Sequence, residues 1–258
     1  MKRAVITATA LVLLLAGCSA PAPVPTATPE PDSLGGTVTV DAAASLTDTF
    51  KAIGAAFTAE HPGVTVTFNF GGSSGLATQI VQGAPVDVFA AASGATMKTV
   101  TDATLAVGTP AVFVTNSLEI AVPADNPGKV TGLKDFANPA LAIAVCAVEV
   151  PCGAAAKAVL DGAGITASVD TYEQDVKSVL SKVEVDEVDA GLVYKTDVLA
   201  AGAKVKGIDF PESATAVGKY PIALLAASKN RDAAQAFIDY VLSPQGMKIL
   251  TDAGFDTP

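Results

Sequence analysis

The sequence predicts an α/β fold with two lobes, each a mixed, mostly parallel sheet flanked by helices, joined by hinge strands. Three observations lead to this prediction. Short runs of β-branched and apolar residues alternate with longer segments whose apolar residues recur at helical spacing. Such alternation favours layered α/β packing over an all-helical or all-strand fold. A chain of 258 residues, half of them hydrophobic, is long enough to fill two modest cores.

The first predicted elements lie between residues 36 and 90. Residues 36–41 and 64–70 alternate as strands, and residues 86–90 form a third strand. Between the first two strands, Ser45-Leu-Thr-Asp48 has the pattern of a capping box, in which a serine side chain begins a helix. A glycine-rich turn at residues 71–75 opens the next helix. Apolar residues at helical spacing follow both starts: Leu46, Phe50, Ile53 and Phe57 in one helix, Leu76 and Ile80 in the other.

The remaining elements continue the same alternation. Residues 111–123 form one long β-rich run, and further strands are predicted at residues 141–145, 190–194 and 220–226. Helices are predicted at residues 153–160 and 176–185, and two more at residues 231–250 around Ser243-Pro244. No internal repeat of fixed period is visible.

This order of elements predicts how the chain divides into lobes. The segment 36–115 is too small to complete a lobe alone, so the C-terminal residues are expected to return to it. We therefore predict lobe 1 as residues 36–115 plus 220–258, and lobe 2 as residues 116–219. The chain would cross between the lobes near Asn116 and Lys219, where we expect the hinge.

The N-terminal residues predict export and anchoring. Residues 1–17 have the basic start and short apolar run of a secretory signal peptide. The run ends in Leu15-Ala-Gly-Cys18, which resembles the lipobox of bacterial lipoproteins, so Cys18 is the expected lipid anchor; the alternative is an ordinary signal peptide with a chance cysteine. Residues 18–35 are rich in proline and predict a semi-rigid linker. We expect an extracytoplasmic lipoprotein at the cell membrane.

Charge and histidine content exclude several functions. Removal of Lys2 and Arg3 with the signal peptide takes the formal net charge from −10 to −12. An acidic chain is a poor partner for nucleic acid or for an anionic membrane surface, so we expect neither. The only histidine, His61, leaves too few imidazoles for Ser-His-Asp hydrolysis or for a multi-histidine metal site.

Two cysteines remain in the predicted exported domain. Cys146 and Cys152 would close a short loop, and in an oxidising compartment a disulfide there would stabilise the fold by roughly 2–3 kcal/mol. The alternative is two free thiols. A structural metal is disfavoured because no further ligands cluster near them.

Candidate binding groups gather at predicted helix starts. Ser45, Ser73, Cys152 and Val176 each lie where a helix begins, and a helix N-terminus offers unpaired N–H groups and partial positive charge. Such starts at the carboxyl ends of strands meet at the ligand crevice of an open α/β sheet and can bind an anion. Each has a plainer interpretation. Ser45 and Asp175 are typical helix caps, the Gly-Gly-Ser-Ser-Gly turn suits any flexible loop, and Tyr194 suits a packed aromatic.

Taken together, these segments resemble the periplasmic molybdate-binding proteins of ABC importers. The resemblance covers residues 38–255 and is carried by motifs in the family's order. They are Ala42-Ala-Ala-Ser-Leu-Thr-Asp48, Gly72-Ser-Ser-Gly-Leu-Ala-Thr-Gln-Ile80, Gly83-Ala-Pro-Val-Asp-Val-Phe89, Pro151-Cys-Gly153, Asp175-Val176, Gly191-Leu-Val-Tyr194 and Asp252-Ala-Gly-Phe255.

The resemblance implies a two-lobe periplasmic-binding-protein fold that closes on molybdate, and on tungstate as well. Its ligand contacts transfer to the hydroxyl and backbone N–H groups of Ser45 and Ser73, to the backbone N–H groups of Cys152 and Val176, and to the Tyr194 hydroxyl. Cys152 departs from the small residue usual there, but a main-chain contact tolerates a half-cystine.

The same resemblance implies a monomeric receptor that delivers its ligand to an ABC importer permease, with no enzymatic step, no cofactor and no metal bound as a bare cation. The alternatives are a receptor for sulfate or another tetrahedral oxyanion, a hydrolase using Ser45 or Ser73, and an adhesin or scaffold without a small ligand.

Overall fold

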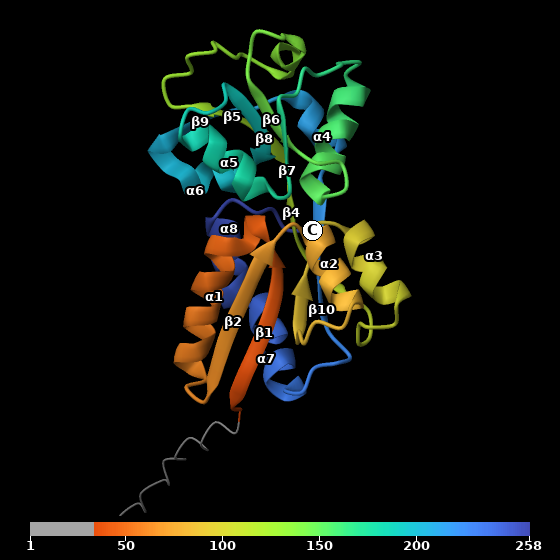
Figure 1. Cartoon of the computed structure of the whole chain (residues 1–258). Helices are drawn as coiled ribbons and strands as arrows, with labels where there is room; N and C mark the ends of the chain where they lie inside the picture. Colours follow the sequence, from red (N-terminus) through yellow and green to blue (C-terminus); the bar gives the residue numbers. More distant parts are fainter. Residues whose placement is uncertain (1–33) are drawn as a thin grey trace, which may run out of the picture. The chain divides into compact units, whose positions relative to one another are not determined.

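The computed structural model describes residues 34–258, which contain two five-stranded mixed sheets flanked by helices (Figure 1). This confirms the predicted fold class. The signal peptide at residues 1–17, the anchor Cys18 and nearly all of the linker predicted at residues 18–35 lie outside the described residues. Of the helices in this described part, none combines the length and apolarity needed to cross a membrane.

The first sheet is built from segments near both ends of the described chain. Its strands lie in the order β2 (Val64–Gly71), β1 (Gly36–Ala43), β3 (Val88–Ala90), β10 (Gly218–Leu224) and β4 (Ala111–Asn116). β1 pairs in parallel with β2 and β3, whereas β10 is antiparallel to β3 and β4. The C-terminal strand β10 therefore inserts between β3 and β4.

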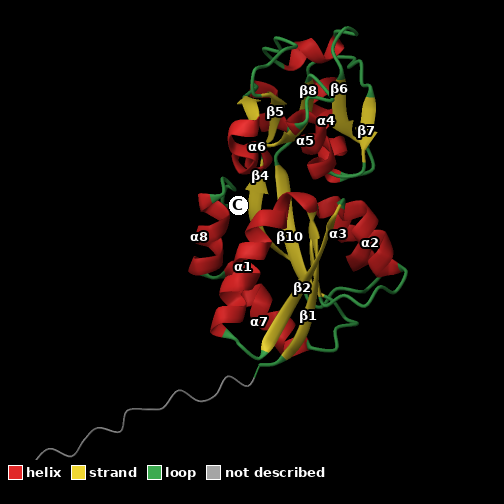
Figure 2. Cartoon of the chain, turned by 60° about the vertical axis from the view of Figure 1, so that its left-hand side comes forward, coloured by secondary structure: helices red, strands yellow, loops and turns green. Residues whose placement is uncertain are grey.

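Helices cover both faces of this sheet (Figure 2). The helices are α1 (Thr47–Glu60), α2 (Ser73–Val81), α3 (Gly94–Asp102), α7 (Arg231–Leu242) and α8 (Pro244–Asp252). Because side chains alternate along β1, Val38 and Val40 share one face and pack in one core with Phe50, Phe57 and Phe237 of α1 and α7. A separate core joins α2 and α3 to β3; it includes Leu76, Ile80, Phe89, Met97 and Val100.

The second sheet is formed by the middle of the chain. Its strands lie in the order β7 (Thr171–Glu173), β6 (Ile143–Cys146), β8 (Ala190–Tyr194), β5 (Leu118–Pro123) and β9 (Val205–Ile208). Helices α4 (Pro151–Gly162), α5 (Val176–Glu184) and α6 (Lys195–Ala201) belong to this lobe. Ile120, Ile143 and Leu192 are fully buried in its core with Val159 and Val179 of α4 and α5.

The structure differs from the predicted elements in three ways. The run at residues 111–123 is two strands in different sheets, separated by Ser117 alone. Each sheet has two parallel and two antiparallel pairings, so parallel pairing is less dominant than predicted. The elements α3, α6, β7 and β9 were not predicted, because they are short or rich in threonine and lack a clear apolar period.

Candidate functional site

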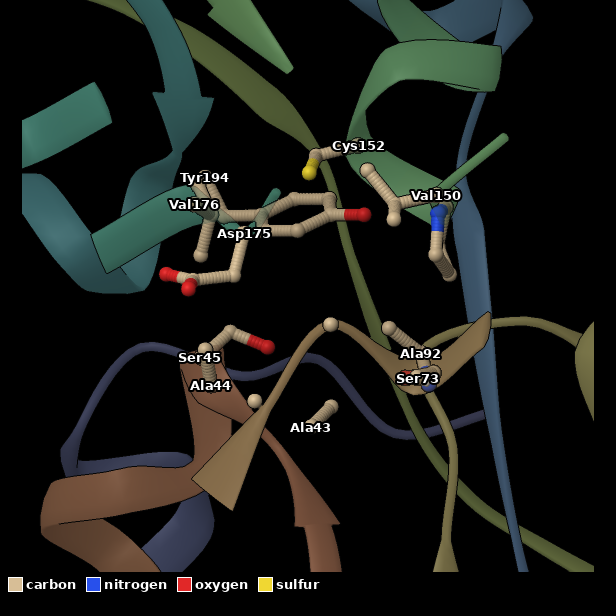
Figure 3. Close-up of a pocket in the computed structure, with 13 residues that line it drawn as sticks. Ala43, Ala44, Ser45, Ser73, Ala92, Val150, Cys152, Asp175, Val176 and Tyr194 are labelled. Carbon is tan, nitrogen blue, oxygen red and sulfur yellow. Dashed lines mark hydrogen bonds between the residues drawn. The ribbon is translucent and has the colours of Figure 1, made fainter. Parts of the chain in front are cut away.

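All five predicted site residues line one small cavity between the lobes (Figure 3). The cavity contains about 220 Å³ of space free of protein atoms, part of it open to solvent. Its lining residues are Ala43, Ala44, Ser45, Gly71, Gly72, Ser73, Ala92, Val150, Pro151, Cys152, Asp175, Val176 and Tyr194. The first seven come from lobe 1 and the last six from lobe 2, so neither lobe forms the cavity alone.

Ser45 reaches the cavity from a short 3-10 turn, Ala44–Leu46, between β1 and α1. The predicted capping box is wrong: α1 has Leu46 at its N-cap position and no side-chain cap. The Ser45 hydroxyl instead lies 2.9 Å from the Tyr220 hydroxyl oxygen, and the Asp48 carboxylate accepts from Lys177 at 2.9 Å. Each of these two side chains therefore contacts a residue distant in the sequence and does not cap α1.

Ser73 is the first residue of α2 and is 1% exposed. Its hydroxyl oxygen accepts from the backbone N–H of Ala92 at 3.0 Å. Because that oxygen already accepts, the single hydrogen of the Ser73 hydroxyl is free to be donated elsewhere. The Ser73 hydroxyl is therefore a hydrogen-bond donor whose oxygen is held by the backbone N–H of Ala92.

The first turn of α4 is fixed by a disulfide between Cys146 and Cys152, whose Cα atoms are 5.7 Å apart. Pro151 begins the helix, where its missing N–H costs nothing and its fixed φ favours the helical turn. Gly153 follows because a Cβ there would lie 1.9 Å from the carbonyl oxygen of Ala147. Together these features hold the backbone at Cys152 against the loop after β6.

Asp175 caps α5, as predicted. Its carboxylate accepts from the backbone N–H of Ser178 at 2.9 Å and from the Ser178 hydroxyl at 3.1 Å. In Figure 3 this carboxylate points away from the Tyr194 hydroxyl. The only acidic side chain in the lining is thus committed to a helix, which leaves the N–H of Val176 at the cavity.

Tyr194 ends β8 and is 2% exposed. Burial, followed by the nearby charge of Asp197, raises the pKa of its phenol well above the ordinary value. The phenol therefore stays protonated and can donate a hydrogen bond at any physiological pH. Its ring meets the ring of Tyr220 edge-on, with centroids 6.1 Å apart.

Tyr220 and Asn116 are buried polar residues that the sequence did not single out. Tyr220 lies on β10 and is fully buried, and Asn116, at the end of β4, is 1% exposed. The side-chain amide of Asn116 donates to the Thr196 hydroxyl at 2.8 Å. Tyr220 thus contacts the Ser45 turn, and Asn116 contacts α6. The only signal for them in the sequence was the predicted hinge near Asn116 and Lys219.

The electrostatics of the cavity favour a small anion. No lysine, arginine or histidine is among the lining residues. Instead the first turns of α2, α4 and α5 meet there, and the first N–H groups of a helix have no partner within it. Three hydroxyls add further donors. Within residues 34–258, no group of three or more histidine, cysteine, aspartate or glutamate side chains could hold a metal ion.

Two further polar contacts join the lobes beside the cavity. Lys177 of α5 pairs with Asp48 of α1, and the Ser74 hydroxyl donates to the carbonyl oxygen of Glu149 at 2.5 Å. Lys177 also lies 3.5 Å from the buried carboxylate of Asp197, which accepts from the backbone N–H of Tyr194 at 3.1 Å. The lobes are therefore in contact around the cavity.

Comparisons with known proteins agree with this arrangement. Residues 38–256 match the family of bacterial extracellular solute-binding proteins. The chain is 42% identical over 222 residues to the molybdate-binding protein ModA of Mycobacterium tuberculosis, covering 86% of this chain and 85% of that protein.

Two solved structures share the fold. The periplasmic molybdate-binding protein of Azotobacter vinelandii has a TM-score of 0.73 at 21% identity, covering 86% of this chain and 99% of that chain. The sulfate-binding protein SubI of Mycobacterium tuberculosis has a TM-score of 0.74 at 19% identity, covering 86% of each chain. At these identities the structures support the fold and do not distinguish between the two anions.

We predict that Asp197 makes stability depend on pH. Burial raises its pKa from 3.8 to about 6 although Lys177 lowers it, so the folded chain holds this proton more tightly than the unfolded chain. The free energy of unfolding should therefore fall as pH rises from about 4 to about 6, by up to roughly 3 kcal/mol.

The Asp197→Asn variant stays neutral and should gain stability over the wild type as pH rises through this window, measured by urea unfolding at pH 4 and pH 7. Asp125→Asn, at an exposed position, is the matched control. A difference between Asp197→Asn and wild type that stayed constant with pH would contradict the prediction.

Proposed function

Because the chain belongs to the family of bacterial extracellular solute-binding proteins, we propose that it is the extracytoplasmic receptor of an ABC importer and binds molybdate between its two lobes. Proteins of this family are transport receptors rather than enzymes. The observation that carries the proposal is one cavity in which hydroxyls and helix starts of both lobes converge without a cationic side chain. Family membership also confirms the resemblance noted in the sequence motifs.

In this proposal the oxyanion accepts hydrogen bonds from five residues. These are Ser45 and Ser73 through their hydroxyl and backbone N–H groups, Cys152 and Val176 through their backbone N–H groups, and Tyr194 through its hydroxyl. Molybdate and tungstate carry no proton near neutral pH, so their oxygens need donors only. The metal atom reaches the protein inside its oxyanion, so no side chain has to coordinate it.

Sulfate is the second candidate because its oxygens accept hydrogen bonds from the same donors. A protonated phosphate fits less well, since it would need an acceptor and the Asp175 carboxylate in the lining is occupied by Ser178. Cavity size must separate molybdate from sulfate. The sequence relatives named for molybdate support the larger anion.

Anchoring and delivery complete the proposal. Cleavage after residue 17 and lipidation of Cys18 would tether a monomeric domain to the cell membrane, with residues 18–35 as the spacer. Lobe 1 (36–115 plus 220–258) and lobe 2 (116–219) would close on the ligand about the crossings near Asn116 and Lys219, and the closed receptor would pass its ligand to the permease. Tungstate is proposed as a second ligand.

Gly72 allows the close approach that such closure requires. A Cβ at this position would lie 2.2 Å from the carbonyl oxygen of Gln174, which belongs to lobe 2. The carbonyl oxygen of Gln174 belongs to the backbone and cannot move aside as the end of a flexible side chain can. A side chain at residue 72 would therefore force the lobes apart. The glycine-rich turn is therefore needed for lobe contact as well as for the start of α2.

We expect molybdate to raise the melting temperature of the domain that begins after Cys18. Ligand at a hundred times its Kd should add about 2.7 kcal/mol to the free energy of unfolding. A thermal-shift panel of molybdate, tungstate and sulfate on ligand-stripped protein should give large shifts with the first two and a small one with sulfate. No shift with molybdate would rule out the proposed function, and a larger shift with sulfate would favour the second candidate.

Tyr194→Phe should weaken molybdate binding by roughly 1–3 kcal/mol, because it removes one hydrogen bond to a charged group. Isothermal titration calorimetry measures the change, and the melting temperature of the ligand-free variant checks its fold. Tyr172→Phe, at an exposed position of lobe 2, is the matched control. Unchanged affinity in Tyr194→Phe would remove this tyrosine from the binding site.

Gly72→Ala should weaken molybdate binding at least about tenfold, because the added methyl group keeps the lobes apart and a tenfold loss costs only 1.4 kcal/mol. Gly75→Ala, in the first turn of α2, is the control, since a Cβ there meets nothing within 4 Å. Calorimetric titration of both variants provides the measurement. Equal affinities in the two variants would show that the contact at Gly72 is not needed for binding.

A further inference from the structure

We propose that the ion pair between Lys177 and Asp48 holds the two lobes closed and thereby slows release of the bound anion. This contact is called the interlobe ion pair below. The inference rests on the proposed function, because it concerns what keeps that same site closed. Lys177 would be a positioning residue, since neither Lys177 nor Asp48 lines the cavity.

The interlobe ion pair joins two helix starts that carry predicted site residues. Lys177 follows Val176 in the first turn of α5, and Asp48 lies in the first turn of α1, just after Ser45. The ammonium nitrogen of Lys177 is 2.9 Å from a carboxylate oxygen of Asp48. A movement that separated Ser45 from Val176 would therefore also break this contact.

Of the lysine–carboxylate pairs within residues 34–258, this one alone links the lobes. The others connect side chains of the same lobe, as Lys98 and Asp102 do within α3. The Ser74 hydroxyl also contacts the opposite lobe, but its acceptor is a neutral backbone carbonyl group. The interlobe ion pair is thus the contact between the lobes that substitution of a charge can remove.

Asp197 would keep Lys177 in place when the lobes separate. Its side chain is fully buried in lobe 2, and one of its carboxylate oxygens lies 3.5 Å from the Lys177 nitrogen. The same carboxylate accepts from the backbone N–H of Tyr194. Leaving a buried carboxylate without its cation is strongly destabilising, so Lys177 should stay beside Asp197 in both states. Opening would then break only the contact with Asp48, whose side chain is 62% exposed.

Lys177 remains charged between these two carboxylates. Burial by itself lowers the pKa of its ammonium group, but Asp197 and then Asp48 raise that pKa above its ordinary value. In the open receptor Lys177 would still be paired with Asp197, so closure adds only the attraction of Asp48. An exposed ion pair of this kind changes a rate or an affinity by about two- to fivefold.

The test measures how fast bound molybdate leaves the protein. Protein loaded with radiolabelled molybdate is mixed with excess unlabelled molybdate at about pH 8 and low ionic strength, and calorimetric titration gives the Kd. Asp48→Asn should raise the dissociation rate about two- to fivefold, because the closed state loses one ion pair. Asp48→Glu keeps the charge and should restore most of the wild-type rate. Asp102→Asn is the matched control, because its side chain is also 62% exposed and its partner Lys98 lies in the same helix.

A double-mutant cycle isolates the contribution of the pair. In the Lys177→Gln background, Asp48→Asn should change the dissociation rate less than about 1.5-fold, because no cation remains to pair with residue 48. Loss of an acidic charge also reduces repulsion of the dianion, but that effect changes mainly the association rate and does not require Lys177. Lys182→Gln, whose carboxylate partners lie in its own lobe, is the control for Lys177→Gln.

A second background covers a failure of Lys177→Gln to fold, since that variant leaves Asp197 without its cation. In Lys177→Gln/Asp197→Asn the buried charge is removed together with the lysine. The amide oxygen of the new side chain can still accept from the backbone N–H of Tyr194. Asp48→Asn should again have almost no effect on the dissociation rate in this background.

Salt dependence separates an ion pair from a structural defect. The Debye length falls from about 30 Å at 0.01 M salt to about 3 Å at 1 M salt, so exposed charges are screened as salt is added. The ratio of dissociation rates between Asp48→Asn and wild type should therefore approach one at high salt. A ratio caused by altered packing around residue 48 would not change in this way.

Three outcomes would overturn the inference. The first is an unchanged dissociation rate in Asp48→Asn, and the second is an effect of Asp48→Asn that persists fully without Lys177. The third is a Lys177→Gln variant that slows association and leaves dissociation unchanged, which would make Lys177 a group that attracts the anion. Wild-type protein that bound no molybdate would overturn the proposed function itself, and the inference with it.

Discussion

In the function we propose, a doubly charged anion leaves water for a cavity whose lining offers it no cationic side chain, and this requirement would explain how the cavity is built. The formal net charge of the chain is −10, so the attraction would have to be local. It comes from the starts of α2, α4 and α5, where backbone N–H groups are not paired within the helix. Each sheet brings helix starts to one edge, and the two edges face each other across the cavity.

A hydroxyl group has only one hydrogen, and this sets a second requirement for a neutral site. When a serine hydroxyl donates its hydrogen to a ligand, a second group that donates a hydrogen bond to the serine oxygen fixes the orientation of the hydroxyl. For Ser73 that donor is the N–H of Ala92, and the Ser45 hydroxyl lies 2.9 Å from the Tyr220 hydroxyl oxygen. Buried polar groups that look like unexplained core residues are, on this view, the outer layer of the binding site.

Much of this arrangement could be predicted from the sequence, and the failures have physical causes. Periodicity found the long helices and most strands, and the predicted helix starts pointed to four of the five predicted residues that line the cavity. Ser45 and Asp48 had the local pattern of a helix cap. In the structure Ser45 contacts Tyr220 and Asp48 contacts Lys177, and both partners are distant in the sequence. The break at Ser117 lies within a continuous β-rich run, so only the sheet pairing reveals it.

Ser117 bears on how the lobes would move in the closure we propose. It alone separates β4 from β5, while the second crossing, between β9 and β10, is longer. If one lobe rotates about the crossing at Ser117, displacement would grow with distance from that residue. Tyr194 pairs with Leu118 next to Ser117 and would move little. The start of α4 would then travel further than Tyr194 to reach the bound anion.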